Sequence, residues 1–223
     1  MEICEKLVVL GAGGFGREIA FVLSEVNKKS GLYHMLGFVD NDISLQGKMI
    51  DGYPVLGDDS WLLNYSSKIN VVIGIGNPKI RKQAVDKFRI KDNIVYPNII
   101  ADNVKYSSST TIGMGCIICL SAVLTVNISL GDFVLVMSNS VIGHDSFLDD
   151  FTTIYPSVTI SGNVSVGRYS EVGVGAKIIQ RKSIGQNSVV GAGAVVIENI
   201  PDNCIVAGVP AKPIKIKEIH NVS

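Results

Sequence analysis

An aliphatic residue recurs at every sixth position of this chain from residue 112 to residue 196. The series has fifteen members and no gap: Ile112, Ile118, Leu124, Leu130, Val136, Ile142, Leu148, Ile154, Ile160, Val166, Val172, Ile178, Ile184, Val190 and Val196. A helix does not keep this period on one face, because its apolar stripe recurs at three and four residues. A strand meander needs turn signals only about every eight to twelve residues. The short, even period therefore predicts a parallel β-solenoid with short flat strands.

Glycine follows directly after seven of the fifteen aliphatic residues, as a corner after each strand would require. These are Gly113, Gly131, Gly143, Gly167, Gly173, Gly185 and Gly191. Residues 201–223 lose the period, which is typical of a segment that caps the end of a solenoid.

Charge is balanced over the chain and sparse in the repeat. Twenty basic and twenty acidic residues give no electrostatic case for nucleic acid or an anionic membrane. The N-terminus lacks a basic leader, and no apolar run approaches the ~20 residues of a membrane helix, so a cytoplasmic protein is expected. Only nine of the forty charged residues lie between residues 107 and 197. Outer faces of a solenoid with so little charge predict self-association of the chain.

The first part of the chain has a different pattern. Apolar runs at Leu7–Leu10, Met35–Val39 and Val71–Ile75 alternate with helical patterns, and Asn77-Pro78 is a good helix start. A short strand is expected at Pro54–Leu56, with Asp58 or Asp59 as the cap of the helix that follows. This alternation predicts a small parallel α/β sheet. We expect an α/β domain over residues 1–97 and a solenoid domain over residues 98–223, with the segment around residues 93–98 as the bridge.

A glycine-rich turn, Gly11-x-Gly13-x-x-Gly16, stands between the first predicted strand and the first helix. Such glycines let backbone N–H groups approach a diphosphate at a helix N-terminus. Asp40, after the second strand, can bond a ribose or a base edge. The alternative is a tight turn that binds nothing. Because the domain is about half the length of a full dinucleotide fold, a single nucleotide or a nucleotide-sugar is at least as natural a ligand as NAD.

One histidine stands in the repeat: His144, after Ile142-Gly143 and before Asp145. A lone histidine is more often a surface residue than a catalyst. A corner position, however, takes the side chain out of the core, and Asp145 can hold one ring nitrogen and raise the basicity of the other. A zinc hydratase on a similar solenoid would need about three imidazoles, so no metal site is expected.

The spacing of Cys116 and Cys119 gives a C-x-x-C sequence, which raises the possibility of a zinc or redox site. Neighbouring repeats place small residues at the position of Cys116. Ordinary packing inside the solenoid is therefore the better interpretation.

Six motifs occur in a fixed order over almost the whole chain, from residue 7 to residue 213. They are G-A-G-G-F-G at 11–16, F-V-D-N at 38–41, I-G-N-P at 75–78, the hexapeptide repeats, G-H-D at 143–145 and G-V-P-A-K-P at 208–213. This combination resembles the bacterial sugar acetyltransferases of the sialic acid O-acetyltransferase (NeuD)/PglD-like family. The resemblance implies a Rossmann-like domain that binds a nucleotide-sugar rather than NAD, followed by a left-handed parallel β-helix. It also implies acetyl-CoA as co-substrate and a homotrimer with active sites between subunits.

The resemblance also assigns roles to individual residues. His144 matches the general base, and Asp145 the residue that increases its basicity. Nucleotide-sugar contacts match Gly13, Gly14, Phe15, Asp40, Asn41 and Gly76; acetyl-CoA contacts match Thr153, Gly162, Val174, Ala192 and Lys212. Two positions depart from the pattern of some relatives: Asn41 replaces an aspartate, which leaves nucleotide choice open, and Thr153 replaces a histidine, so that contact must be weaker or made differently.

The expected reaction is direct transfer of acetyl from acetyl-CoA to the amine of a nucleotide-linked 4-amino-4,6-dideoxy sugar. One alternative is O-acetylation of sialic acid or another sugar hydroxyl. An NAD-dependent oxidoreductase is a second alternative, although the second half of such a fold is missing. A third is a non-catalytic trimeric scaffold, which would leave the sequence Gly143-His144-Asp145 unexplained.

Overall fold

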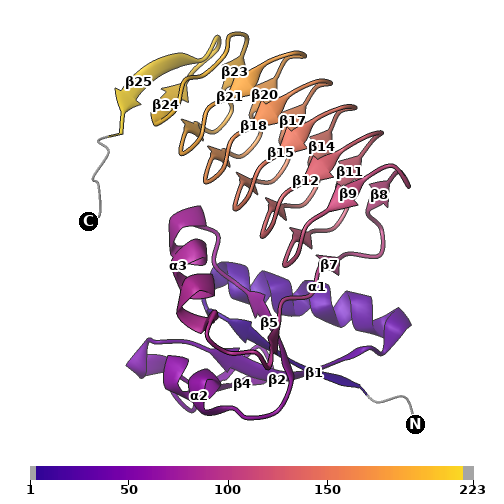
Figure 1. Cartoon of the computed structure of the whole chain (residues 1–223), viewed down its shortest axis with the longest axis vertical. Coiled ribbons are helices and arrows are strands. Elements are labelled where there is room, and N and C mark those ends of the chain that lie inside the picture. Colours follow the sequence, from indigo (N-terminus) through magenta and orange to yellow (C-terminus); the bar gives the residue numbers. More distant parts are fainter. Residues whose placement is uncertain (1–3, 218–223) are drawn as a thin grey trace. The chain divides into compact units, whose positions relative to one another are not determined.

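The computed structural model describes residues 4–217 (Figure 1). The chain forms two compact units that divide after Asp102. The last six residues of the predicted tail lie outside the described range. Each unit is considered by itself below.

The first unit is built on a six-stranded sheet with the order β3-β4-β2-β1-β5-β6. All neighbours are parallel except the pair β3–β4. The strands are β1 (Glu5–Leu10), β2 (Tyr33–Val39), β3 (Met49–Ile50), β4 (Tyr53–Gly57), β5 (Ile69–Ile73) and β6 (Ile94–Val95). Strand β5 is buried along its whole length and β1 over its last four residues, as expected for central strands of a sheet covered on both faces. This is the Rossmann-like α/β sheet that the sequence predicts.

Three helices connect the strands: α1 (Gly14–Ser30), α2 (Asp59–Asn64) and α3 (Pro78–Phe88). A short 3₁₀ turn, η1 (Ile43–Leu45), precedes β3. The predicted caps are present, because Asp58 accepts a hydrogen bond from the Ser60 N–H and Asn77 accepts from the N–H groups of Lys79 and Ile80. The predicted bridge around residues 93–98 differs in one respect, since it contains β6, which pairs with β5. A two-residue strand carries too little periodicity to be seen in a sequence.

Close packing explains one glycine of the first turn. A Cβ on Gly16 would lie 2.9 Å from the carbonyl carbon of Gly11 and closer still to its oxygen. Helix α1 therefore starts directly against the end of β1, which only glycine at position 16 permits.

The second unit is a left-handed parallel β-helix, as the resemblance predicts. Strand β7 (Ile99–Ile100) precedes the division, and the strands of the second unit are two residues long from β8 to β23. They are β8 (Lys105–Tyr106), β9 (Thr111–Ile112), β10 (Ile117–Ile118), β11 (Val123–Leu124), β12 (Ser129–Leu130), β13 (Leu135–Val136), β14 (Val141–Ile142), β15 (Phe147–Leu148), β16 (Thr153–Ile154), β17 (Thr159–Ile160), β18 (Ser165–Val166), β19 (Glu171–Val172), β20 (Lys177–Ile178), β21 (Ser183–Ile184), β22 (Val189–Val190), β23 (Val195–Val196), β24 (Cys204–Ala207) and β25 (Lys212–Ile216).

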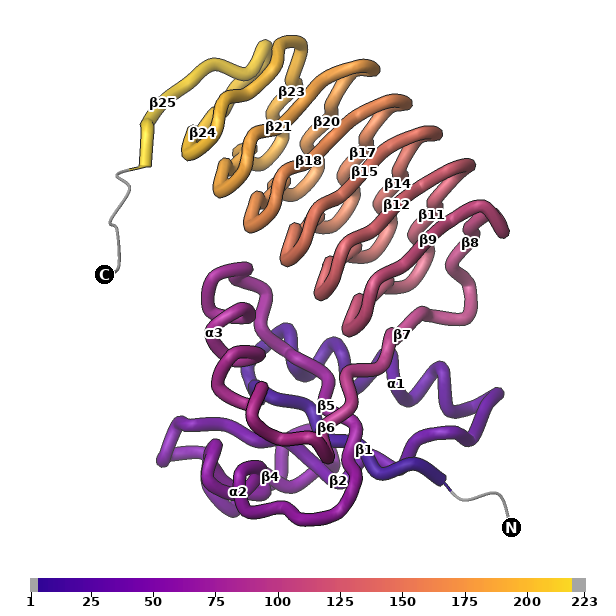
Figure 2. Tube along the Cα trace, in the orientation of Figure 1, coloured from indigo at the N-terminus to yellow at the C-terminus, as the bar shows by residue number. Residues whose placement is uncertain are grey.

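Each coil takes eighteen residues, because Leu124 pairs with Ile142 and Ile142 with Ile160. Every third strand belongs to the same face, so the stacked coils seen in Figure 2 carry three parallel sheets. Every residue of the six-residue series is the second residue of its strand, and all are buried except the half-buried Ile112. The series therefore fills the interior of the solenoid.

The glycines after the strands have a different cause from the one predicted. None of the seven has a positive φ. Instead, a Cβ on Gly143 would lie 2.6 Å from the carbonyl carbon of Ser161 and 2.7 Å from the Gly162 nitrogen. The next coil passes too closely for any side chain there. From Gly115 to Gly193, the left-handed residue of each corner is the third after the aliphatic one, for example Asn127 and Asp145.

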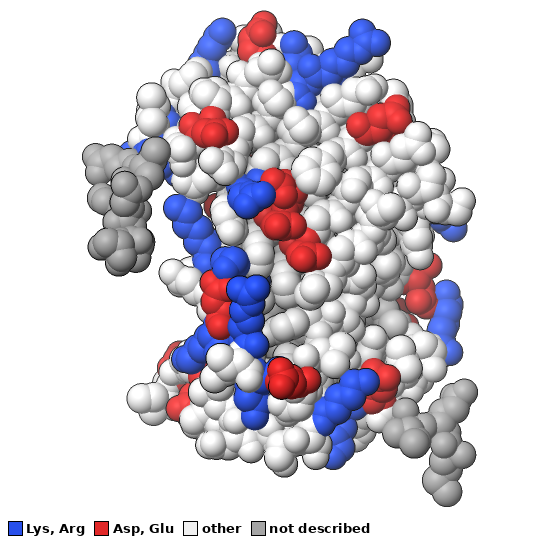
Figure 3. Space-filling model, viewed as in Figure 1, with Lys and Arg blue, Asp and Glu red and all other residues white. Residues whose placement is uncertain are grey.

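The predicted capping tail begins with one more strand of the stack. Strand β24 pairs in parallel with β22, and β25 then turns back antiparallel onto β24. Figure 3 shows that the visible face of the solenoid carries few charged side chains. Within residues 4–217, every helix is too short or too polar to span a lipid bilayer.

Candidate functional site

His144 stands at the corner that follows β14. Ile142 points into the core and is fully buried, and Gly143 allows the next coil to pass. Two residues beyond Ile142, the chain directs the His144 side chain outward, where 57% of it is exposed. Asp145, in the left-handed conformation with φ 59°, presents its carboxylate beside it.

The two side chains form one polar contact, with His144 Nδ1 2.8 Å from Asp145 Oδ2. A carboxylate only accepts hydrogen bonds, so Nδ1 is the donor, and in the neutral imidazole Nε2 then keeps its lone pair. The hydrogen bond from His144, followed by one from Asn127, lowers the pKa of Asp145 below its ordinary value. Asp145 is therefore ionised across the neutral range, and the pair can take up a proton at Nε2.

Gly162 lies one coil beyond His144, directly beneath the imidazole ring. A Cβ at this position would lie 2.8 Å from His144 Cδ2 and nearer to Nε2 and Cε1. Only glycine leaves room for the ring in this orientation. Gly162 is itself buried.

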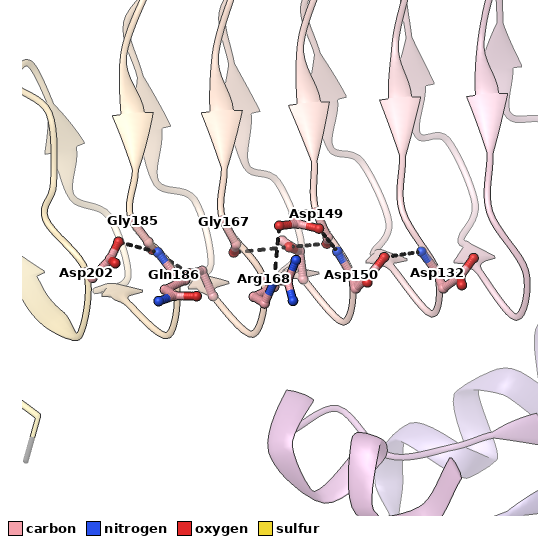
Figure 4. A network of polar contacts seen from close by, with 10 residues as sticks. Asp132, Asp149, Asp150, Gly167, Arg168, Gly185, Gln186 and Asp202 are labelled. Atoms are coloured by element: carbon pink, nitrogen blue, oxygen red, sulfur yellow. Dashed lines mark hydrogen bonds and ion pairs between the residues drawn. The ribbon is translucent and has the colours of Figure 1, made fainter. Parts of the chain in front are cut away.

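The backbone N–H of Gly162 differs from the equivalent groups at another edge of the solenoid. At the edge after β9, β12 and β21, aspartates of the following coil accept these N–H groups: Asp132 accepts from Met114, Asp150 from Asp132 and Asp202 from Gln186. Figure 4 shows the last two of these contacts in a row along the coils. In residues 4–217, no acceptor is found for the Gly162 N–H. Next to His144, this leaves a backbone donor without an acceptor in the described residues.

The residues assigned to acetyl-CoA are spread over more than one edge of the chain. Val174 and Ala192 lie one coil apart at the edge after β19 and β22, and both are exposed. Gly162 lies at the edge of His144, after β17. Lys212 is exposed on β25, and Thr153 is buried on β16. One chain alone therefore does not bring the five positions together.

A cavity of about 370 Å³ opens at the carboxyl edge of the α/β sheet. Its lining includes the predicted Asp40 and Asn41, and also Gly11. Asp40 accepts hydrogen bonds from the Ala12 N–H at 2.7 Å and from the Asp42 N–H at 2.9 Å. The carboxylate is thereby fixed at the rim, as expected for ligand sites in open α/β sheets.

Asp59 and Lys87 complete this cavity, and the sequence did not identify them. Asn41 Nδ2 donates to Asp59 Oδ2 at 2.8 Å, and Lys87 Nζ forms an ion pair with the same carboxylate. Asp59 follows the predicted strand at residues 54–56, where a carboxylate at the sheet edge was the available signal. The sequence indicates Asp59 only as a candidate helix cap, and Asp58 takes that role.

The remaining predicted nucleotide-sugar contacts lie outside the lining of the cavity. Gly14 is the first residue of α1, Gly13 is its N-cap, and Phe15 follows in the first turn. Gly76 lies in the turn between β5 and α3. They remain predictions for the part of a ligand that extends beyond the cavity.

Both cysteines of the C-x-x-C sequence are free thiols inside the solenoid. Cys116 is fully buried, and its Sγ lies 3.1 Å from the carbonyl oxygen of Gly131 in the next coil. The part of the chain that the structure describes holds no group of three His, Cys, Asp or Glu side chains arranged for a metal ion.

Comparison with known proteins gives a consistent result. The family profile described as the PglD N-terminal domain matches residues 6–88. The acetyltransferase domain of PglB from Neisseria gonorrhoeae is 34% identical with a TM-score of 0.86, and the match covers 94% of this chain and 100% of that one. The same domain has been solved with acetyl coenzyme A. No curated protein sequence matches this chain.

Two further solved structures match over nearly the full length. PerB from Caulobacter crescentus, solved with CoA and GDP-perosamine, is 27% identical with a TM-score of 0.85, and the match covers 96% of this chain and 99% of that one. WeeI from Acinetobacter baumannii is 28% identical with a TM-score of 0.84, covering 94% and 100%.

Proposed function

This chain belongs to the PglD-like family of hexapeptide-repeat sugar acetyltransferases and is an acetyl-CoA-dependent acyltransferase; we propose that its acceptor is the amine of a nucleotide-linked 4-amino-4,6-dideoxy sugar. The similarity to an N-acetyltransferase solved with CoA and GDP-perosamine supports an amino sugar as acceptor. Nucleotide linkage is supported by the cavity at the sheet edge, where Asp40, Asn41 and Lys87 offer polar contacts.

One observation carries the mechanism: the His144–Asp145 contact of 2.8 Å at an exposed corner, which leaves Nε2 on the side away from the carboxylate. In the proposed reaction, the lone pair of the neutral sugar amine forms a bond to the thioester carbonyl carbon. His144 Nε2 takes the proton that the amine nitrogen gives up. Asp145 stabilises the resulting imidazolium through Nδ1.

The tetrahedral intermediate then collapses and the carbon–sulfur bond breaks. The sulfur leaves with the electron pair, and the imidazolium returns the proton to it. The products are the amide and free CoA thiol, and His144 is again neutral. Transfer is direct, since a base placed beside the acceptor needs no acyl-enzyme.

Gly162 has a second role in this proposal. Its N–H has no acceptor in residues 4–217 and lies under the ring of the base. A backbone donor at this place can stabilise the oxyanion that develops on the thioester oxygen. The glycine then serves the reaction twice, through its N–H and through its missing Cβ.

We further propose a homotrimer with active sites between neighbouring subunits. Gly162 lies on one edge of the solenoid and Val174 and Ala192 on another, so a groove that uses all three needs a second copy. The low charge of the repeat supports the same association. A molar mass of three chains in solution is the expected result, measured by light scattering.

A panel of candidate acceptor sugars tests the proposed acceptor. Purified protein and acetyl-CoA are mixed with 4-amino sugars linked to UDP, GDP or dTDP, and with free sialic acid, and CoA thiol release is followed. We expect turnover with at least one nucleotide-linked amino sugar and an N-acetyl product by mass spectrometry. Turnover with sialic acid alone would replace this proposal by O-acetylation, and a silent panel would refute the proposed acceptor.

A further inference from the structure

The corner before that of His144 carries a polar residue that the mechanism has not used. Asn127 follows β11 as Asp145 follows β14, and the two strands pair in register. Both residues have the left-handed conformation, with φ 54° and 59°. Asn127 therefore lies one coil away from Asp145, in the same position of the coil.

A chain of hydrogen bonds runs through these stacked corners to the imidazole. Ser109 Oγ accepts from the Asn127 N–H at 2.9 Å, which fixes the backbone of Asn127. Asn127 Nδ2 donates to Asp145 Oδ1 at 3.0 Å. Asp145 Oδ2 then accepts from His144 Nδ1 at 2.8 Å. The two oxygens of one carboxylate thus have two separate partners.

This division matters because the carboxylate is exposed. With 45% of its side chain in contact with solvent, Asp145 would otherwise rotate freely and exchange His144 for water. Holding Oδ1 from the previous coil leaves Oδ2 directed at Nδ1. The backbone does not do this alone, since the Asp145 N–H bonds to Val126 and restrains only the main chain.

Asparagine ladders also occur where no catalytic group is near. Asn187 Nδ2 donates to Asn203 Oδ1 at 2.7 Å between two other corners, with Asn187 also at φ 54°. Joining coils is thus one use of such a contact. Asn127 differs in its acceptor, which is the residue that holds the imidazole, and Asn187 supplies a matched control.

We propose that Asn127 is a positioning residue: it anchors Asp145 from the preceding coil, so that the imidazole of His144 stays in one orientation with its proton on Nδ1. The inference rests on the proposed role of His144 as the base. Asn127 touches neither substrate and acts only through Asp145. Its loss should therefore lower kcat and leave the KM values of both substrates within about twofold.

Two substitutions remove the Asn127–Asp145 hydrogen bond without straining the left-handed backbone at position 127. Asn127→Asp keeps the shape and tolerates the left-handed conformation, but its carboxylate cannot donate. Asn127→Gly removes the side chain without strain. We expect kcat to fall about tenfold in both, since a hydrogen bond to a charged group is lost. Asn187→Gly is the control and should keep the wild-type kcat.

The second readout is independent of activity. Nitrogen-15 NMR of the histidine side chains reports which ring nitrogen carries the proton, and His144→Gln identifies the His144 signals among the three histidines. Wild type and Asn187→Gly should show the Nδ1–H form alone. Both Asn127 variants should show a mixture of the two neutral forms.

A wild-type kcat in both folded Asn127 variants would overturn the proposal, and so would an unchanged His144 signal in both. A fall in kcat of similar size in Asn187→Gly would overturn it too, because it would show a general effect on the coils. An active His144→Ala enzyme would instead refute the proposed base. The NMR comparison would still test the contact in that case.

Discussion

Replacing Gly162 by alanine should abolish most of the activity while leaving the fold intact. The added Cβ would lie 2.8 Å from His144 Cδ2 and nearer to Nε2 and Cε1. Non-bonded atoms need about 3.5–4 Å, so the ring must retreat by about 1 Å or rotate away. The backbone of Gly162 does not have a positive φ, so alanine itself causes no strain there.

The size of the effect follows from this displacement. A misplacement of about 1 Å in a reacting group costs about 10²-fold in rate, or about 2.7 kcal/mol in the activation barrier. Stability should change little, because the His144 side chain is 57% exposed and can move into solvent. We expect the free energy of unfolding to stay within about 1 kcal/mol of wild type.

The assay is CoA thiol release at saturating substrates, with urea unfolding measured in parallel. Gly143→Ala is the matched control, since its Cβ would meet backbone atoms of Ser161 and Gly162 at 2.6 and 2.7 Å. Backbone cannot retreat as a side chain does, so this variant should lose about 3 kcal/mol of stability. A folded Gly162→Ala enzyme with kcat within about threefold of wild type would refute the assigned place of the ring.

Three other substitutions test separate parts of the molecule. Lys87→Met leaves the Asp59 carboxylate without its cation. The substitution should lower the free energy of unfolding by about 1–2 kcal/mol. In steady-state kinetics it should raise KM for the nucleotide-sugar but not for acetyl-CoA. Hydrogen bonds lower the pKa of Asp145 in the folded chain. The ionised carboxylate therefore stabilises the fold above the unfolded carboxyl pKa of about 3.9, and this stabilisation is lost as the pH falls through the lower pKa of the folded state. Unfolding free energies of wild type and Asp145→Asn should therefore differ at pH 7 and converge below about pH 4; a constant difference would contradict the contact. Gly16→Ala should cost about 3 kcal/mol or more in urea unfolding, and a neutral result would refute the close approach of Gly11.

The solenoid could be predicted almost completely from the sequence. A six-residue period fixes which side of every strand faces inward, and the structure buries that series as expected, apart from the half-buried Ile112. The cause of the glycines could not be predicted. It depends on the distance between the backbones of successive coils, eighteen residues apart, and a local pattern holds no information about that distance.

The candidate site could be predicted only in part, because contacts between successive coils also lie outside a local sequence pattern. His144 and Asp145 are neighbours in sequence, so their contact could be anticipated. Asn127 and Gly162 lie a full coil away on either side, and their relation to His144 appears only once the register is known. In the α/β unit, Asp59 and Lys87 come from different helices, and only the fold joins them.

The central claim is that His144 removes the proton from the acceptor amine. The most direct measurement is the single-turnover rate of His144→Ala with acetyl-CoA and the nucleotide-linked amino sugar that wild type accepts. A rate about 10²–10⁴ lower than wild type, with unchanged binding of both substrates, is the result this account predicts. A folded variant that transfers acetyl within about threefold of the wild-type rate would contradict it.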